Sequence, residues 1–446
     1  MLTRLRVQGF KNLLDVDLRF GPLTCIAGRN AVGKSNLFDA IRFLSLLTRH
    51  SIMEAVKLLR EARGRAPDPR SLFTAFDGYR APEMRFTAEL LIDREVQDDF
   101  GVSAAASIST LRYEVAFRLA KDNGVERLEL AEESLRPITL EEARRELGFP
   151  AKQVFKTSAI KGRRSTLFIS THGGQIRVHQ EGHGGRVVPA PKSSKTILGG
   201  TVSYDFPTIL AAHREMESWQ TLLLEPSAMR APDLYSDPRS IDSRGAHLPA
   251  TIERLRRAEQ IPGQVYSELA NHVAELIEDI RDLRIRDDEK TETLTLEVTG
   301  KAGVVHPASS LSDGTLRFLV LATLAIDPDA KGVICVEEPE NGIHPERIPA
   351  MVHLLREIAV NPDFPIDTGN PLRQVIVNTH SPAVIKALKD SELVYIDEKQ
   401  VALDAAIGSV VLLRVPNGSW RANMQGGAVL PLTSGQLRPY QIDLPL

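Results

Sequence analysis

Cysteine is scarce in this sequence of 446 residues, which contains only Cys25 and Cys335. Each lies within an apolar, strand-like run, so we expect two buried, reduced thiols rather than a disulfide framework. The N-terminal residues MLTRLRVQGFKN contain no apolar core of the kind found in secretory signals. Together these absences predict a cytoplasmic protein.

Long apolar runs are also missing. The longest stretches, residues 318–326 and 332–336, fall far short of the roughly 20 residues that a membrane-spanning helix needs. We therefore expect no membrane partner. No repeat of 20–50 residues is visible, and no heptad pattern is long enough for an extended coiled coil.

The charge of the chain is unevenly distributed. The formal net charge is −3, but residues 151–204 contain nine Lys or Arg residues and a single acid, Glu181. This segment therefore carries +8, and the rest of the chain carries −11. Such a basic segment can attract the phosphate backbone of DNA. It can equally be a solvated region without a partner, and the sequence leaves both interpretations open.

The periodicity of apolar residues predicts an α/β fold. Alternation predicts strands at 2–9 and 15–27, paired with strands at 84–93 and 110–120 in an antiparallel sheet, while helical spacing predicts helices at 35–48 and 52–62. From Leu311 onward, helices and strands alternate as helix 314–326, strand 332–337, helix 345–359, strand 373–378, helix 382–389 and strand 392–397.

The middle of the chain has less regular patterns. Residues 150–207 indicate hairpins, followed by helices at 213–224, 246–258 and 263–282 and a strand at 293–299. In the tail, 430–440 is expected to be a docking segment. We therefore divide the chain into an N-terminal lobe (1–150), an inserted β-hairpin and helical region (151–300) and a C-terminal lobe (301–446).

Residues 28–35, GRNAVGKS, fit the pattern G-x-x-x-x-G-K-[ST] in full. The motif follows an apolar strand and opens a helix, so backbone amides and the helix N-terminus can hold phosphates. Lys34 is expected to reach the β- and γ-phosphates of a nucleotide, and the Ser35 hydroxyl is expected to bind Mg²⁺. Asn30 and Gly33 belong to the same cofactor-binding loop.

Two carboxylates end the apolar strand at 332–337. Alternation predicts that Glu337 and Glu338 point to opposite sides, which favours two different roles. Glu337 is expected to hold Mg²⁺, directly or through water, and Glu338 is expected to polarise the attacking water as a general base.

Two further polar groups complete the pattern. In LSDGT (311–315), Ser312 or Asp313 could serve only as a helix cap, or Ser312 and the Gly314 amide could bind the γ-phosphate of a nucleotide held by another subunit. The position of this motif about 20 residues before the acidic strand favours the second interpretation. His380 lies at the carboxyl end of a core strand, where α/β sheets place ligands, and is expected to donate a hydrogen bond to the γ-phosphate.

The order of these motifs resembles the ABC-ATPase set of Walker A, signature, Walker B with a catalytic Glu, D-loop and switch His. EEPENGIHP, NTHSP and the opening LRVQGFKNLLDVDLRFGPLTCIAGRNAVGKSNLFDAI are similar to the OLD/RecF-like group of ATPases with SMC-like heads. The similarity covers residues 1–48 and 305–397, with a looser match at LEPSAMRAPD and GAHLPATIERL.

This resemblance implies an ABC-ATPase head with a mixed core sheet, an antiparallel β subdomain and an inserted helical and β region. It implies ATP and Mg²⁺ as cofactors. By position, the nucleotide and metal would be bound by Gly33, Lys34, Ser35 and Asn36. Ser312 and Gly314 would act from a second copy, and Glu338 and His380 would complete the catalytic site.

The sequence departs from the family pattern at three places. Glu337 stands where Walker B usually has Asp, Asp313 replaces a signature glycine, and no glutamine can be assigned to the Q-loop. OLD proteins also carry a C-terminal Toprim nuclease with an acidic metal cluster. Fewer than 50 residues follow Asp397, and their only acids are Glu398, Asp404 and Asp443, so we expect no fused nuclease.

The leading hypothesis is an ATP-hydrolysing switch that forms a homodimer or higher oligomer around ATP. It would sense DNA or a foreign protein and control a separately encoded effector, as do the ATPase components of two-gene anti-phage systems. An alternative is a RecF-like repair ATPase that clamps DNA with residues 151–204. A third, a transporter ATPase, is disfavoured by the missing Q-loop and by the OLD-like EEPE.

Overall fold

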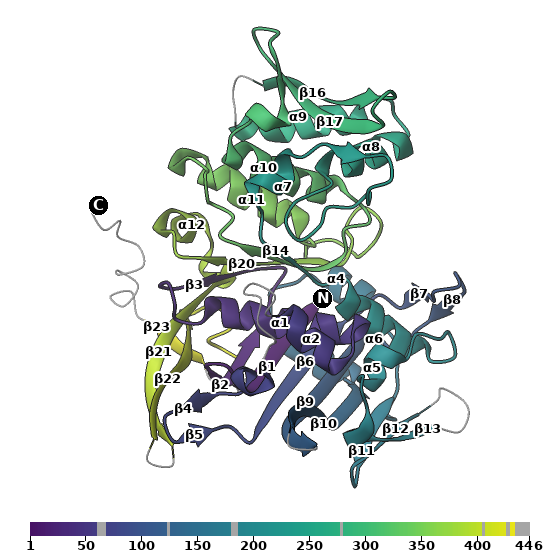
Figure 1. Cartoon of the computed structure of the whole chain (residues 1–446), viewed down its shortest axis with the longest axis vertical. Coiled ribbons are helices and arrows are strands. Elements are labelled where there is room, and N and C mark those ends of the chain that lie inside the picture. Colours follow the sequence, from purple (N-terminus) through teal and green to yellow (C-terminus); the bar gives the residue numbers. More distant parts are fainter. Residues whose placement is uncertain are drawn as a thin grey trace.

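The computed structural model describes residues 1–59, 68–122, 125–179, 186–276, 280–403, 406–424 and 429–432. Two large sheets organise these residues, and a smaller sheet lies at the far end of the molecule (Figure 1). The result is a mixed α/β fold with one mixed, largely parallel sheet and one antiparallel sheet, as the sequence predicted.

The eight-stranded antiparallel sheet contains the first strands of the chain. Their alternating apolar residues face a core that includes the packed rings of Phe10, Phe43, Phe86 and Phe117. In spatial order the strands are β13 (Arg186–Pro189), β12 (Gln175–Val178), β11 (Ile169–His172), β10 (Val125–Pro137), β9 (Thr110–Asp122), β6 (Glu83–Leu91), β1 (Leu2–Phe10) and β2 (Leu13–Arg19).

The seven-stranded mixed sheet forms the centre of the molecule (Figure 1). Its spatial order is β14 (Gln220–Leu222), β19 (Gly332–Glu337), β20 (Arg373–Thr379), β3 (Leu23–Ala27), β21 (Leu393–Leu403), β22 (Ala406–Pro416) and β23 (Val429–Leu432). The first five strands are parallel. The carboxyl ends of β3, β19 and β20 therefore meet at one edge, where α/β proteins place their ligands.

Helices cover both faces of this sheet (Figure 1). On the face toward the antiparallel sheet lie α1 (Lys34–Arg49), α2 (Ile52–Leu58) and α6 (Pro207–Glu217). Helix α1 buries Leu37, Ile41 and Leu44 at the helical spacing seen in the sequence. The opposite face is covered by α10 (Asp313–Ile326), α11 (Ile348–Ile358) and α12 (Pro382–Ala387).

A helical and β layer packs on α10 and α11, away from the mixed sheet (Figure 1). Its sheet joins β15 (Asp233–Leu234), β16 (Ile280–Asp288) and β18 (Val305–Pro307) to β17 (Thr293–Gly300). Its helices are α7 (Pro226–Arg230), α8 (Leu248–Ala258) and α9 (Gln264–Leu276).

Short elements complete the described chain. Three are helices, α3 (Leu140–Glu146), α4 (Gln153–Ala159) and α5 (Ile197–Gly200), and two are hairpins, β4 (Ala75–Phe76) with β5 (Tyr79–Arg80) and β7 (Glu95–Gln97) with β8 (Ser103–Ala105). Single 3-10 turns are η2 (Pro69–Leu72), η3 (Ala190–Lys192), η4 (Ala308–Ser310), η5 (Pro345–Arg347) and η6 (Asp390–Glu392).

Two predicted helices give way to strands before their expected ends. The helix predicted at 213–224 ends at Glu217, and residues 220–222 instead form β14, which completes the edge of the mixed sheet beside β19. The helix predicted at 263–282 ends at Leu276, and β16 begins at Ile280 to pair with β17. In both cases strand pairing overrides a local helical pattern, with distant β19 in the first case and with the next strand of a hairpin in the second. Most of the predicted docking segment at 430–440 lies outside the described residues.

Candidate nucleotide site

The loop between β3 and α1 is shaped by backbone conformations that suit glycine. Gly33 has φ 110°, and a side chain there would collide with the Asn12 amide. A Cβ at Gly28 would lie 2.7 Å from the Ile396 carbonyl oxygen. Ala31 also adopts a positive φ of 68°, which is uncommon for a residue with a side chain. The loop is thus held in a tight arc at the N-terminus of α1.

Lys34 lies inside this arc. Its Nζ donates hydrogen bonds to the carbonyl oxygens of Gly28 (2.6 Å) and Arg29 (2.7 Å). Desolvation lowers the pKa of Lys34, while the nearby carboxylates of Glu338 and Glu340 oppose that shift. Ser35 is exposed in the first turn of α1, and Asn30 is exposed in the loop.

The loop is braced by Asn12, a residue that sequence reasoning did not select. Asn12 Nδ2 donates to the Val32 carbonyl oxygen (3.2 Å), and Asn12 Oδ1 accepts from Asn36 Nδ2 (2.8 Å). The only sequence signal was the position of Asn12 in GFKN, between the first two strands. Asn36 therefore shapes the loop through Asn12.

Glu337 ends β19 in a crowded acidic environment. Burial raises the pKa of its carboxyl group, and the carboxylates of Asp39 and Glu338 raise it further. Asp39 lies on α1, one helical turn after Ser35, so the two can share a face of the helix. Carboxylate and hydroxyl oxygens such as those of Glu337 and Ser35 are the ligands that a hard divalent cation such as Mg²⁺ prefers.

Glu338 leaves the strand conformation. Its φ of 43° lies in the left-handed region, and its amide donates to the backbone oxygen and Oδ1 of Asn378, both at 3.1 Å. A conformation that a side chain rarely adopts is often retained at functional sites. The simple strand alternation used in the sequence prediction therefore does not describe Glu338.

Glu338 and His380 form a pair across β19 and β20. His380 Nδ1 lies 2.8 Å from Glu338 Oε1, and Asn341 Nδ2 donates to Glu338 Oε2 at 3.0 Å. Desolvation opposes ionisation, but the hydrogen bonds from Asn341 and His380 hold the pKa of Glu338 below its usual value. Glu338 therefore stays a carboxylate at neutral pH.

Ser312 and Gly314 lie at the start of α10. The Ser312 hydroxyl accepts a hydrogen bond from the Thr315 amide (3.2 Å), so it caps the helix. A Cβ at Gly314 would lie 2.2 Å from the Gly342 carbonyl oxygen, so only glycine lets the two backbones approach. Within the described residues, no hydrogen bond or ion pair joins Ser312 or Gly314 to the phosphate loop of the same chain.

A cavity of about 620 Å³ opens beside Asn12. Its lining combines cationic and aromatic groups, among them Lys11, Arg70, Phe73 and Phe76. The neighbouring Gly408 is in contact with the Phe76 ring, where no side chain would fit. The cavity is continuous with the residues that brace the phosphate loop.

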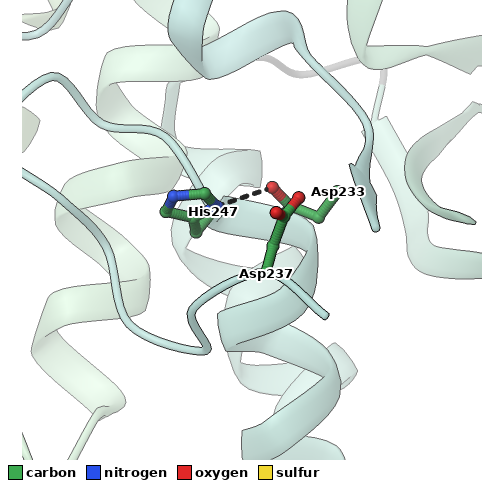
Figure 2. A group of neighbouring side chains, drawn as sticks. All are labelled: Asp233, Asp237 and His247. Carbon is green, nitrogen blue, oxygen red and sulfur yellow. Dashed lines mark hydrogen bonds and ion pairs between the residues drawn. The ribbon is translucent and has the colours of Figure 1, made fainter. Parts of the chain in front are cut away.

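A separate group of side chains, Asp233, Asp237 and His247, points toward a common centre (Figure 2). Asp233 accepts hydrogen bonds from His247 Nδ1 (3.0 Å) and the Ala250 amide (2.9 Å), and Asp237 accepts from the Leu234 amide (2.7 Å). The contacts of Asp233 anchor the start of α8, and the contact of Asp237 stabilises the turn that follows β15. No helix among the residues described here is long and apolar enough to cross a bilayer.

Comparisons with solved structures return SMC heads. The SMC head bound to the C-terminal winged-helix domain of ScpA has a TM-score of 0.48 at 14% identity, covering 92% of this chain and 98% of that chain. An SMC head with an extended coiled coil, bound to ScpA derived from Pyrococcus furiosus, gives 0.46 at 12% identity, covering 92% and 96%.

Similarity to curated proteins is local. The DNA replication and repair protein RecF of Paenarthrobacter aurescens (strain TC1) is 38% identical over 66 residues, 15% of this chain and 16% of that protein. RecF of Parabacteroides distasonis is 41% identical over 51 residues, 11% and 14% of the two chains. The chain thus matches about a sixth of the length of these relatives.

The family assignment rests on a match across most of the chain. A family profile described as "AAA domain, putative AbiEii toxin, Type IV TA system" matches residues 23–386. This span contains the phosphate loop, the start of α10, the acidic end of β19 and His380. The chain therefore belongs to this AAA-domain family of ATP-binding, ABC-type P-loop ATPases.

Proposed function

We propose that this protein is an ATP-hydrolysing, SMC/OLD-like switch that dimerises around ATP and regulates a separately encoded effector in anti-phage defence. One observation carries the proposal. Lys34, Glu338 and His380 follow three neighbouring parallel strands, and the register aligns Ala27 with Thr379 and Glu337 with Asn378. The groups expected to bind phosphate and activate water thus converge at one edge of the sheet.

The phosphate loop would bind the triphosphate. Lys34 would exchange its two carbonyl partners for β- and γ-phosphate oxygens, an exchange of neutral acceptors for charged ones. The cavity beside Asn12 has the position and the aromatic lining to receive the nucleoside. Asn30, Gly33 and Asn36 would shape this half of the site.

Mg²⁺ prefers carboxylate and hydroxyl oxygens, which Glu337 and Ser35 offer. Ser35 and Glu337 would hold the ion. Its positive charge would oppose the burial and the neighbouring carboxylates that raise the pKa of Glu337. A bound Mg²⁺ supplies charge neutralisation for the phosphates. Glu337 in place of Asp provides the same oxygen chemistry on a longer side chain.

Glu338 would act as the general base. Its lowered pKa keeps it ready to accept a proton from water, and Asn341 and His380 hold both of its oxygens in place. His380 Nε2 makes no hydrogen bond to the described residues, and the imidazolium form of His380 would donate from Nε2 to a γ-phosphate while Nδ1 donates to Glu338. His380 would then link the presence of that phosphate to the orientation of the base.

Ser312 and Gly314 would complete the site of a second copy. Both present polar groups at the N-terminus of α10, where the helix field favours an anion. Hydrolysis would remove the phosphate that joins the two copies, so the dimer would exist in two states. The effector would respond to this change between the two states.

Glu338→Gln tests the proposal. We expect this variant to bind ATP and Mg²⁺ and to form a stable dimer, with twice the 49.2 kDa mass of one chain. Its turnover should fall by roughly 10²–10⁴-fold, because a general base contributes about that much. Light scattering and phosphate release measure the two effects. Wild-type turnover in Glu338→Gln would remove its role as base, and a persistent monomer would contradict the ATP-joined dimer.

A second candidate function is a RecF-like, DNA-binding repair ATPase. It is favoured by the exposed cations of residues 151–204, which include Lys152, Lys161, Arg163, Arg177, Lys192 and Lys195. The local similarity to RecF proteins points the same way.

A further inference from the structure

The start of α10 carries a charge that conflicts with its proposed role. Asp313, the first residue of the helix, stands where the signature motif has a glycine, and its side chain is 48% exposed. Its carboxylate neighbours the Gly314 amide, which is proposed to meet a γ-phosphate. A carboxylate and a phosphate repel each other at this range, so an uncompensated Asp313 would weaken binding.

Arg230 compensates this charge. It ends α7, and its guanidinium forms a close ion pair with the Asp313 carboxylate. The same nitrogen, Nη2, donates to the Leu311 carbonyl oxygen at 2.9 Å. One arginine therefore holds both the backbone and the acidic side chain of the loop that contains Ser312.

The position of Arg230 is itself fixed from both sides. Met229, the preceding residue, is buried and packs against Gly245, where a Cβ would lie 2.8 Å from the Met229 side chain. Asp233, three residues later, pairs with Leu294 of β17. Its carboxylate is held by His247 (Figure 2) and by the Ala250 amide. Arg230 thus projects from a rigid segment toward the start of α10.

We propose that Arg230 is a positioning residue of the second half-site, which neutralises Asp313 and orients Ser312 and Gly314 toward the γ-phosphate held by another copy. The inference rests on the proposed function. It explains how a loop with an acid in place of glycine can still receive an anion. It also connects that loop to α7, which follows edge strand β14 of the mixed sheet.

A merely structural ion pair would behave differently. Partly exposed pairs contribute little to stability, so loss of Arg230 should leave the fold intact. If Arg230 acted only through packing, removing the charge of Asp313 would not restore dimerisation to a variant that lacks Arg230. If Arg230 compensates that charge, removing the charge would restore dimerisation.

The test uses the full chain with the Glu338→Gln background, ATP and Mg²⁺, and measures dimerisation by sedimentation. Arg230→Ala should weaken dimerisation roughly ten- to hundred-fold, the range for a charge-assisted contact. The affinity of the monomer for a fluorescent ATP analogue should not change. Adding Asp313→Asn to Arg230→Ala should restore dimerisation to within about threefold of the parent. Arg244→Ala, which removes an exposed pair with Asp242 in the same layer, is the matched control and should have no effect.

Two outcomes overturn the inference while the proposed function stands. The first is an Arg230→Ala protein that dimerises as tightly as the parent. The second is a double variant that remains as weak as Arg230→Ala, because Arg230 would then not act through Asp313. A parent protein that stays monomeric with ATP would instead overturn the proposed function, and the inference with it.

Discussion

At the scale of single residues, Lys34 is the group on which nucleotide binding most depends. Its ammonium is buried among loop carbonyls, and a triphosphate would be its only charged acceptor in the loop. Lys34→Ala should weaken ATP binding by roughly 100-fold or more, because charge-assisted hydrogen bonds to more than one phosphate are lost. Calorimetry measures the effect, with exposed Lys57→Ala as a control. Unchanged affinity would remove the phosphate-loop assignment.

Residues within a motif could be predicted, and residues that support a motif could not. GRNAVGKS specifies a strand, a turn and a helix within one local segment, so Gly33 and Lys34 could be selected from spacing alone. Asn12, Asn378 and Arg230 contact motif residues that lie 20 to 83 positions away. Such partners are chosen by the fold. A single sequence contains no signal for their pairing.

At the scale of elements, α10 is held at both ends. Ser312 caps its N-terminus, and Arg373 at the start of β20 donates to three carbonyl oxygens at its C-terminus, those of Leu324, Ala325 and Asp327. The other end of β20 leads to His380. One arginine therefore joins the helix that begins beside Ser312 to the strand that leads to His380.

Arg373→Ala should destabilise the fold by about 2–3 kcal/mol, because buried carbonyls lose charged donors and a cation leaves the C-terminus of α10. Urea unfolding measures the change, and exposed Lys331→Ala is the control. Equal unfolding midpoints for Arg373→Ala and wild type would contradict the capping role. We expect ATP affinity at the phosphate loop to remain, since Arg373 lies at the opposite end of the sheet.

Helix α5 is joined to β10 by a buried acid. Glu133 accepts hydrogen bonds from the amides of Ile197 (2.6 Å) and Leu198 (2.9 Å) and from the Tyr113 hydroxyl (3.0 Å). Burial raises the pKa of Glu133 to about 7, although these donors oppose the shift. Its proton is therefore bound more tightly in the folded protein than in the unfolded chain.

Stability should consequently depend on pH between the unfolded and folded pKa values of Glu133. Because only the folded state holds the proton in this window, the contribution of Glu133 should fall by about 1.4 kcal/mol per pH unit from about 4.5 to 7. The free energy of unfolding of wild type, minus that of Glu133→Gln, should therefore fall as pH rises from about 4.5 to 7 and should level off above pH 7. Denaturation at several pH values measures it. A difference independent of pH would contradict the raised pKa.

Elements with strong local patterns were predicted well, and the exceptions share a cause. The helix at 35–48 and the strand at 332–337 have uninterrupted apolar periodicity, and both occur within two residues of the prediction. Residues 220–222 and 280–282 continued a helical pattern in the sequence but form strands. Their conformation depends on strand pairing with residues outside the helical pattern itself, those of β19 and β17.

At the scale of the whole molecule, the proposed site has two parts in each copy, and no hydrogen bond or ion pair among the described residues joins the phosphate loop to Ser312 or Gly314. The phosphate loop, Glu338 and His380 gather at the sheet edge, whereas Ser312 and Gly314 open α10. A second copy would supply the missing half to each site, so oligomerisation and nucleotide binding would be thermodynamically linked. The basic residues of 151–204 lie on other elements, β11 to β13 and the segments around them.

The switch and repair proposals therefore differ in how the molecule should treat DNA. For a switch acting on a protein effector, we expect DNA affinity at physiological salt in the weak, non-specific range of about 10⁻⁴–10⁻⁶ M. Neutralising Lys161, Arg163 and Lys192 to Ala should then leave effector capture unchanged. Arg164 is retained in this design because its guanidinium packs 4.6 Å from the centroid of the Phe168 ring.

Fluorescence anisotropy across a salt series, with Lys57→Ala as control, measures DNA binding. Tight, ATP-dependent binding whose salt slope falls by about 2–3 in the triple variant would favour the repair ATPase, since each lost phosphate contact lowers the slope by about 0.9.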